Sequence, residues 1–268
     1  MIDYAAWYGL EKNPFLKNSG DILVDTTDIR EAHVRLNGLK DSNGFGLITG
    51  EPGRGKTTAV RTWANSLNQS LFKVTYSSIS SLTVLDFYRK IAAGLGSTPS
   101  FHKNDLFDDI QREIRRFALE KKVTPVIIID EADMLSHKVL RDLQLMFNFE
   151  MDSRDLAIVL LVGQNQLINT LNQNAHESLR QRILMNYHML GITKEEGRQY
   201  IARKLESVGC LQPVFNENAV ESILNSANGA PRVINKICDK SLLIGAMQGI
   251  KLIDPETVLK AVNEITLG

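Results

Sequence analysis

The sequence predicts an α/β fold in which a five-stranded parallel sheet carries helices on both faces, followed by a segment that is helical throughout. Over the first 190 residues, short apolar runs of strand length alternate with segments of helical period, a pattern typical of parallel sheets. A glycine-rich loop joins the first strand to a helix. After residue 190 the strand-like runs stop and helix-start signals recur. We therefore expect an α/β domain with an N-terminal extension over residues 1–190 and a helical lid subdomain over residues 191–268.

Short apolar runs are expected to form the sheet. Two of them, at residues 126–129 and 156–162, consist almost entirely of aliphatic side chains, which is typical of strands buried on both faces. A third, at residues 45–49, leads directly into the glycine-rich loop. The expected strands cover residues 45–49, 71–76, 126–129, 156–162 and 187–190.

Segments of helical period separate these runs. After the loop, apolar residues from Val60 to Leu67 recur at positions i, i+3, i+4 and i+7, which places them on one face of a helix. Comparable spacing predicts further helices at residues 28–39, 106–117 and 136–149. The strand, loop and helix order around the loop is the context that a phosphate-binding loop requires.

Helix-start signals define the segment after residue 190. Thr193 and Glu196 have the spacing of a capping box, in which each side chain bonds to the backbone N–H of the other residue. Asn216 is suited to cap a second helix, and Pro231 suits the first turn of a third. Asp254, which precedes a proline, opens a fourth. The lid is therefore expected to contain four helices.

Composition gives few constraints on function. The chain has 31 basic and 31 acidic residues, so its net charge neither favours nor excludes a nucleic-acid partner. Its two cysteines, Cys210 and Cys238, are far apart, which favours a reduced, intracellular setting. The N-terminus has no signal-peptide pattern, and the most apolar run, residues 156–163, is far shorter than the roughly 20 residues that span a bilayer. We expect a cytoplasmic protein without a membrane contact.

The stretch GEPGRGKTT, from Gly50 to Thr58, matches the P-loop pattern in full. Its glycines allow successive backbone N–H groups to face phosphate oxygens, and the helix that follows directs its dipole at the anion. We expect Lys56 to neutralise the β- and γ-phosphates of ATP and the Thr57 hydroxyl to ligate Mg²⁺. The alternative is a chance glycine-rich turn. The residues expected to contact the nucleotide are Gly50, Glu51, Pro52, Gly53, Arg54, Gly55, Lys56, Thr57 and Thr58, with the Arg54 side chain pointing outward toward a neighbouring molecule.

Asp130 and Glu131 follow the buried run at residues 126–129. An aspartate at the carboxyl end of such a strand is suited to hold Mg²⁺ beside the P-loop. The adjacent Glu131 is suited to orient or deprotonate an attacking water, which favours hydrolysis over simple nucleotide binding. The alternative is a carboxylate pair that caps the turn after the strand.

Polar residues near the last two strands are further candidates. Gln164, ahead of Asn165, is expected beside the γ-phosphate and the attacking water; the alternative is a plain strand-to-helix turn. Arg180 or Arg182 is suited to reach the γ-phosphate of a neighbouring subunit, although solvated surface arginines are an equally good interpretation. Arg232, at the start of a lid helix, is expected to close over the same phosphates from within the chain, the alternative being a surface arginine at a helix start.

The region of residues 103–122 is locally basic. A solvated helix face is the ordinary interpretation of such a run, and a nucleic-acid surface is the alternative. The candidate DNA contacts are Lys103, Lys121 and Lys122. The five histidines show no metal-ligand spacing, and ordinary structural roles are expected for them.

Taken together, the P-loop, the Asp-Glu pair, the polar strand end, the paired arginines and the Gly-Ala-Pro-Arg helix start resemble the AAA+ ATPases over essentially the whole chain. Finer motifs are similar to those of the ExeA/TnsC/TniB/MuB group. These are Tyr8-Gly9-Leu10, Asn13-Pro14-Phe15, Gly50-Glu51-Pro52-Gly53, residues 130–135, residues 148–153 and Val162-Gly163-Gln164.

The resemblance implies two possible functions. One branch of the group comprises regulators of transposition, which assemble on duplex DNA with ATP, bring a transposase to the target and leave after hydrolysis. The other comprises secretion-linked ATPases, in which a similar domain precedes a membrane anchor and acts on an envelope partner. Because the chain ends at Gly268 after the lid, we expect the first function, regulation of transposition. The protein would then form a homo-oligomer, either a ring or a helical filament. It would bind double-stranded DNA without sequence preference through residues around 77–81 and 100–124. A nucleotide-gated scaffold without catalysis is a third possibility, which the intact Asp130-Glu131 pair disfavours.

Overall fold

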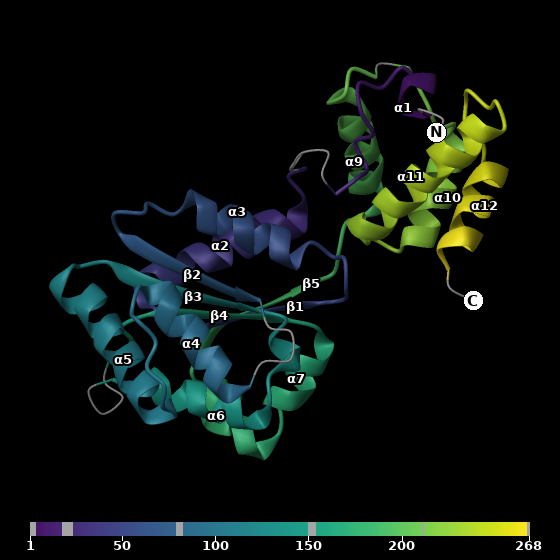
Figure 1. The fold of residues 1–268 in the computed structure, drawn as a ribbon. Helices are drawn as coiled ribbons and strands as arrows, with labels where there is room; N and C mark the ends of the chain where they lie inside the picture. The colour runs from purple at the N-terminus through teal and green to yellow at the C-terminus, as the bar shows by residue number, and fades with distance from the viewer. Residues whose placement is uncertain (1–3, 18–23, 79–82, 150–153, 211, 267–268) are drawn as a thin grey trace. The chain divides into compact units, whose positions relative to one another are not determined.

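The computed structural model describes residues 4–17, 24–78, 83–149, 154–210 and 212–266 (Figure 1). The chain divides into two compact units. The α/β unit comprises Arg30–Glu51 and Lys56–Met189, and the helical unit comprises Met1–Ile29, Pro52–Gly55 and Leu190–Gly268. The tip of the glycine-rich loop, residues 52–55, thus groups with the C-terminal helices rather than with the sheet from which the loop starts.

A five-stranded sheet with the order β2-β3-β4-β1-β5 forms the centre of the α/β unit. Every neighbouring pair of strands is parallel, which confirms the predicted fold class. The central strands β1, β3 and β4 are buried almost throughout because helices cover both of their faces. The strands are β1 Gly44–Gly50, β2 Phe72–Ser78, β3 Thr124–Asp130, β4 Ile158–Gly163 and β5 Ile183–Met189.

Helices cover the two faces of this sheet unequally. In Figure 1, α2 and α3 lie on one face and α4, α5 and α6 lie on the other. The second face carries the larger core, in which side chains such as Phe87, Ile110 and Leu143 pack against Ile127 and Leu161 of the sheet. The helices of this unit are α2 Thr27–Ser42, α3 Lys56–Ser66, α4 Val84–Leu95, α5 Lys103–Arg115, the π-helical η1 Arg116–Glu120, the 3₁₀ turn η2 Ala132–Met134, α6 His137–Met146, α7 Asn165–Leu171, the 3₁₀ turn η4 Asn174–His176 and α8 Glu177–Gln181.

The helical unit begins its helices where the sequence predicts them. Thr193 and Glu196 form the capping box, and the Asn216 and Asp254 side chains accept hydrogen bonds from backbone N–H groups in the first turns that follow them. Pro231 occupies the first position of its helix, where a missing N–H costs nothing. The helices are α1 Tyr4–Trp7, α9 Lys194–Glu206, α10 Glu217–Ala227, α11 Pro231–Met247 and α12 Pro255–Ile265.

The N-terminal residues belong to the helical unit, whereas the sequence analysis grouped them with the α/β domain. The Tyr8 hydroxyl donates a hydrogen bond of 2.9 Å to the carbonyl of Ile250, and Leu10 and Phe15 lie in the core that α9, α10, α11 and α12 form. Apolar burial against helices distant in sequence therefore fixes this segment, a contact that local sequence patterns do not encode.

Three other features differ from the sequence expectation. Strand β5 starts at Ile183 rather than at residue 187, because this edge strand has alternating exposure that a search for apolar runs misses. Helix α6 ends at Met146 rather than at residue 149, and α4 was not expected at all. The motif over residues 148–153 and the range 77–81, where DNA contacts are expected, fall partly outside the described residues. Within the part of the chain that is described, no helix is long and apolar enough to cross a membrane.

Candidate functional site

The glycine-rich loop leaves the carboxyl end of β1 and enters α3. Gly53 and Gly55 have φ values of 79° and 97°, a backbone region that side chains other than glycine rarely adopt. The Lys56 ammonium donates hydrogen bonds to the carbonyls of Gly50 (2.7 Å) and Glu51 (3.0 Å). The lysine is thus held against the start of the loop at the N-terminus of a helix, where anions are favoured.

Asp130 collects three hydrogen bonds at the carboxyl end of β3. Its Oδ2 atom accepts from the Thr57 hydroxyl at 2.8 Å and from the Tyr76 hydroxyl at 3.0 Å, and its Oδ1 atom accepts from the backbone N–H of Glu131 at 2.9 Å. The carboxyl group is buried, with 6% of the residue exposed. A carboxylate with this many donors is a well-positioned acceptor rather than a surface charge.

The oxygen atoms of Thr57 and Asp130 fit a magnesium ion. Both are hard oxygen donors, the class that Mg²⁺ prefers, and their 2.8 Å separation brings them to one place. The described residues contain no cluster of three or more His, Cys, Asp or Glu side chains that would enclose a metal. A site with so few protein ligands suits Mg²⁺, which keeps several waters and is held largely by phosphates of the nucleotide.

Tyr76 is a further residue of this site that the sequence did not predict. Partial burial of the hydroxyl, together with the negative charge of Asp130 and the hydrogen bond to it, raises the pKa of Tyr76 to about 12, so the phenol remains a donor at neutral pH. Tyr76 lies on β2, two residues before the end of the strand, and pairs in register with Ile128 of β3. Only the strand order could have revealed it, because nothing in the local sequence links Tyr76 to Asp130.

Glu131 has an unusual backbone conformation. Its φ is 57° and its ψ is 37°, the left-handed region in which residues other than glycine are uncommon. The side chain is exposed directly after the buried Asp130. Strained positions of this kind cluster at functional sites, and the role of Glu131 in hydrolysis stays a prediction.

The end of β4 brings Asn165 rather than Gln164 to the glycine-rich loop. The Asn165 side-chain amide donates a hydrogen bond to the Glu51 carboxylate. Gln164 is linked through its backbone N–H, which donates to Oδ1 of Asp133 at 2.9 Å. The Asn165 Oδ1 atom is buried and has no hydrogen-bond partner among the described residues. The structure thus brings the Asn165 side chain to the loop, and the expected place of Gln164 beside the γ-phosphate stays a prediction.

Comparison with known proteins identifies the domain. Residues 39–171 match the family model described as an AAA domain, and these residues contain the loop, Thr57, Asp130 and Asn165. The chain therefore carries an AAA domain with the AAA+ P-loop NTPase fold. Solved structures share this fold, and two of the three described next cover more than nine-tenths of the chain.

Two curated relatives resemble this AAA+ chain in sequence. General secretion pathway protein A of Aeromonas hydrophila is 33% identical over 252 residues, which cover 92% of this chain and 45% of that protein. An uncharacterized HTH-type transcriptional regulator of Methanocaldococcus jannaschii is 25% identical over 191 residues, which cover 69% of this chain and 46% of that protein. The chain thus spans less than half the length of either relative.

Solved structures share the fold at low sequence identity. Cdc6p from Pyrobaculum aerophilum has a TM-score of 0.76 at 16% identity, covering 95% of this chain and 71% of its own. The Aeropyrum pernix ORC1 protein in complex with DNA has a TM-score of 0.65 at 18% identity, covering 94% and 68%. The RuvB branch migration motor of Thermotoga maritima has a TM-score of 0.56 at 20% identity, covering 90% and 69%.

The two candidate trans-acting arginines of the AAA+ domain both bond to backbone carbonyls of their own chain. Arg180 donates to the carbonyl of Leu171 at 3.2 Å. Arg182 donates to the carbonyls of Gln144 (3.2 Å) and Phe147 (3.4 Å) at the end of α6, and burial lowers its pKa. Within one subunit, Arg182 therefore serves as a cap for the carboxyl end of a helix, where a cation is favoured.

Arg54 and Arg232 lie together in the helical unit. The Arg54 guanidinium donates a hydrogen bond to the carbonyl of Asn228, the residue that ends α10. Arg232, in the first turn of α11, has its backbone N–H 3.5 Å from the carbonyl of Gly53. The expectation that Arg54 points outward to a neighbouring molecule differs from the structure, because its guanidinium donates a hydrogen bond to a carbonyl of its own chain.

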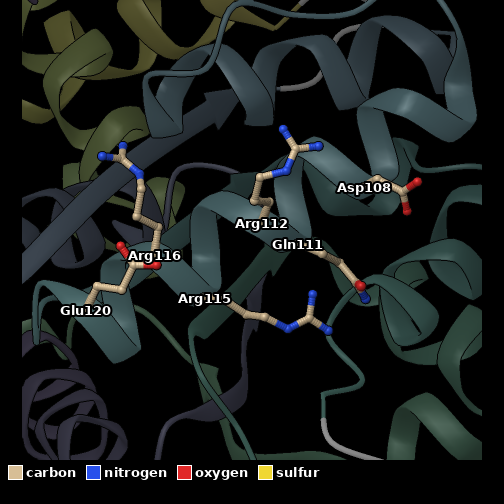
Figure 2. A pocket seen from close by; sticks show the side chains of 6 residues that line it. All are labelled: Asp108, Gln111, Arg112, Arg115, Arg116 and Glu120. Carbon is tan, nitrogen blue, oxygen red and sulfur yellow. The ribbon is translucent and has the colours of Figure 1, made fainter.

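The basic region around α5 and η1 has a mixed charge. A pocket of about 510 Å³ is lined by Arg112, Arg115 and Arg116 together with Gln111 and the carboxylates Asp108 and Glu120. Figure 2 shows these side chains. Two of these arginines form ion pairs on their own helix, Arg112 with Asp109 and Arg116 with Glu113.

The three candidate DNA lysines have partners or surroundings within the chain. Lys103 forms an ion pair with Asp142, and the Lys121 ammonium lies 4.8 Å from the centre of the Phe117 ring. Lys122 has a φ of 57° at the turn into β3. These contacts favour the structural interpretation of Lys103, and a DNA contact at the three lysines stays a prediction.

Proposed function

We propose that the AAA+ domain binds ATP together with Mg²⁺ and hydrolyses the nucleotide. The observation that carries this proposal is the 2.8 Å hydrogen bond between the Thr57 hydroxyl and the Asp130 carboxylate. It joins the first helix after the glycine-rich loop to the end of β3, so the two oxygens that suit Mg²⁺ lie together next to Lys56.

Each side chain has a separate role in this proposal. Lys56 exchanges the carbonyls of Gly50 and Glu51 for phosphate oxygens, since an ammonium bonds more strongly to an anion. Thr57 and Asp130 hold the metal, which when bound supplies positive charge beside the phosphates. Glu131 accepts the proton of the attacking water, and Gln164 and Asn165 are the amides available to orient that water.

Matched variants of the two carboxylates test the proposal. Glu131→Gln keeps the shape of the side chain and should bind ATP but release phosphate at least about 100-fold more slowly. Asp130→Asn should weaken Mg²⁺-dependent nucleotide binding itself. Phosphate release and equilibrium binding of a fluorescent ATP analogue distinguish the two effects. Wild-type protein that neither binds ATP nor releases phosphate would contradict the proposal.

The nucleotide is further proposed to be shared between subunits of a homo-oligomer, with Arg182 or Arg180 supplied by the neighbour. An arginine of this kind contributes about 10³–10⁵ in rate. Mixing tests it: Lys56→Ala and Arg182→Ala proteins, each inactive alone, should regain phosphate release together, because mixed interfaces contain one complete site. Repeating the mixture with Arg180→Ala in place of Arg182→Ala shows which of the two arginines acts on the neighbouring subunit's nucleotide. Full activity of both arginine variants alone contradicts sharing.

For the partner, the relation to General secretion pathway protein A favours a secretion-associated role. The 33% identity extends over 92% of the chain, and it covers both the α/β and the helical unit. In this proposal the ATPase cycle acts on an envelope partner and DNA is not involved. This ranking reverses the order of the sequence analysis, which placed regulation of transposition first.

An ATP-dependent DNA-binding regulator of transposition is the second candidate. Proteins with this fold are seen with DNA, namely the Aeropyrum pernix ORC1 protein in complex with DNA and Drosophila ORC bound to DNA. In this candidate the oligomer assembles on duplex DNA, recruits a transposase, and disassembles after hydrolysis.

Binding to a long random duplex, with and without a non-hydrolysable ATP analogue, separates the two candidates. Nucleotide-dependent, salt-sensitive assembly on the duplex supports the DNA candidate, because phosphate contacts dominate such binding. If the protein binds the ATP analogue normally but does not assemble on the duplex at low salt, the result supports the secretion-associated candidate.

A further inference from the structure

The side chain of Arg54 is enclosed by backbone from two other segments of the helical unit. Its guanidinium bonds to the carbonyl of Asn228, and the neighbouring glycines leave room for it. A Cβ atom built on Gly191 would lie 2.6 Å from both Cδ and Nη1 of Arg54, and one on Gly229 would lie 2.7 Å from Nη1. Any side chain at either position would therefore displace the arginine.

These two segments are joined to each other. The backbone N–H of Ile192 donates a hydrogen bond of 2.9 Å to the carbonyl of Gly229. The Asn228 carbonyl that Arg54 binds belongs to the residue that ends α10, where unpaired carbonyls and the helix dipole favour a cation. The guanidinium thus satisfies an acceptor that the helix itself leaves open.

The same loop touches the start of α11 at a second point. The Gly53 carbonyl lies 3.5 Å from the backbone N–H of Arg232, and a Cβ atom on Gly53 would lie 3.0 Å from the Cβ of Arg232. Residues 53 and 54 of the loop therefore contact both the end of α10 and the beginning of α11. The segment between these contacts, residues 229–231, carries the Gly-Ala-Pro turn that aims Arg232.

We propose that Arg54 is a positioning residue that fixes Arg232 relative to the tip of the glycine-rich loop, residues 52–55. The inference rests on the proposed function, since it assigns Arg54 a part in the nucleotide site. Arg54 does not touch the nucleotide in this proposal. It holds the carbonyl of Asn228, and through the short turn after it the backbone of Arg232, at a set place beside Gly53. The position of the loop tip and that of Arg232 then change together.

A double-mutant cycle tests this coupling. Arg54→Met keeps an unbranched apolar stem and removes the guanidinium donors. Arg232→Ala removes the side chain that is positioned. Each single variant should lower kcat about 10-fold with little change in KM, because a misplaced group mainly affects the transition state. If Arg54 acts through Arg232, the double variant should also lose about 10-fold rather than about 100-fold.

Controls separate positioning from a general loss of structure or charge. Arg203→Ala removes a positive charge from an exposed site of α9 in the same unit and should leave kcat unchanged. Arg54→Lys keeps one donor and should recover part of the rate. Thermal unfolding of every variant shows whether it folds. If Arg54→Met is unstable, Arg54→Lys replaces it in the double-mutant cycle.

Two results overturn the inference: independent effects that multiply to about 100-fold, or an Arg54→Met variant with wild-type kcat. If the wild-type protein releases no phosphate, the proposed hydrolysis is wrong. The cycle is then measured on the dissociation constant of an ATP analogue, where a non-multiplicative double variant still supports the coupling and a multiplicative one still contradicts it.

Discussion

The hydroxyl of Tyr76 donates a hydrogen bond of 3.0 Å to the same Oδ2 atom of Asp130 that the Thr57 hydroxyl bonds. Tyr76 is on β2 and Asp130 is on β3, and these strands are neighbours in the sheet. One oxygen of the carboxylate is thereby held by donors from two different elements. These hydrogen bonds orient the Asp130 carboxylate, which favours a metal site with defined geometry.

Replacing Tyr76 with phenylalanine tests this arrangement. The variant removes the donor but keeps the ring, and a hydrogen bond of this kind contributes about 0.5–1.5 kcal/mol, so we expect Mg²⁺-dependent ADP binding to weaken about 2–10-fold. The free energy of unfolding should change by less than about 0.5 kcal/mol, because Tyr76 is largely exposed. Isothermal titration calorimetry with and without Mg²⁺ measures the effect; equal loss in both conditions would show that Tyr76 does not act through the metal site.

The left-handed backbone of Glu131 predicts a trade-off between stability and activity. Glu131→Gly removes the steric cost of φ near 57° and should raise the free energy of unfolding by up to about 1 kcal/mol, while abolishing the proposed hydrolysis. Glu131→Gln, with the same activity loss, keeps a Cβ and should have wild-type stability. Urea unfolding of the three proteins is the measurement. A glycine variant less stable than the glutamine variant contradicts the interpretation of Glu131 as strained.

Local sequence patterns predicted much of the fold because its signals are short-range. The apolar runs of β3 and β4, the P-loop between β1 and α3, and the caps at Thr193, Asn216 and Asp254 each depend on residues within one turn or one strand. Helix α4 was missed although Thr83 caps it and its buried residues recur at helical spacing. That signal was present, and a systematic search for caps would have found it.

Features of the site that depend on tertiary structure could not be predicted. The contact of Tyr76 with Asp130 requires the strand order, and the bond from Arg54 to Asn228 joins residues 174 positions apart. Which of Gln164 and Asn165 reaches Glu51 likewise depends on how the end of β4 packs beside the loop, and it is the Asn165 amide that donates to Glu51. Motifs identify residue types that suit a reaction, whereas these contacts depend on how separate segments pack.

Glu196 should make the helical unit sensitive to acid. Burial acts to raise the pKa of Glu196, but hydrogen bonds from Thr27 and Thr193 outweigh it and lower the pKa from 4.5 to about 2. Because the folded pKa lies below the unfolded value, the ionised carboxylate stabilises the fold above pH 4.5, and this contribution is lost as the pH falls toward 2.

The difference in unfolding free energy between wild-type protein and Glu196→Gln should therefore be largest near neutral pH and shrink between pH 4.5 and about 2. Glu195→Gln, at an exposed neighbouring position in the same first turn, is the matched control for the loss of one negative charge. Chemical denaturation at a series of pH values provides the comparison. A Glu196→Gln difference that stays constant with pH would rule out the carboxylate as the source.

Gly94 and Gly38 should respond in opposite directions to the same substitution. Both lie inside helices, where alanine is intrinsically favoured over glycine by up to about 1 kcal/mol. A Cβ atom on Gly38 of α2 meets nothing within 4 Å, so Gly38→Ala should stabilise the protein by up to about this amount.

A Cβ atom on Gly94 of α4, in contrast, would collide with Cγ2 of Thr75 on β2. Thr75 is a stiff β-branched residue that is 4% exposed, so it cannot turn away without moving the strand. Overpacking of this kind costs about 1–3 kcal/mol, which exceeds the gain in helix propensity, and Gly94→Ala should be destabilising. Thermal or urea unfolding of the two variants decides the matter. A stabilised Gly94→Ala would mean that α4 packs less closely on β2 than the Thr75 contact indicates.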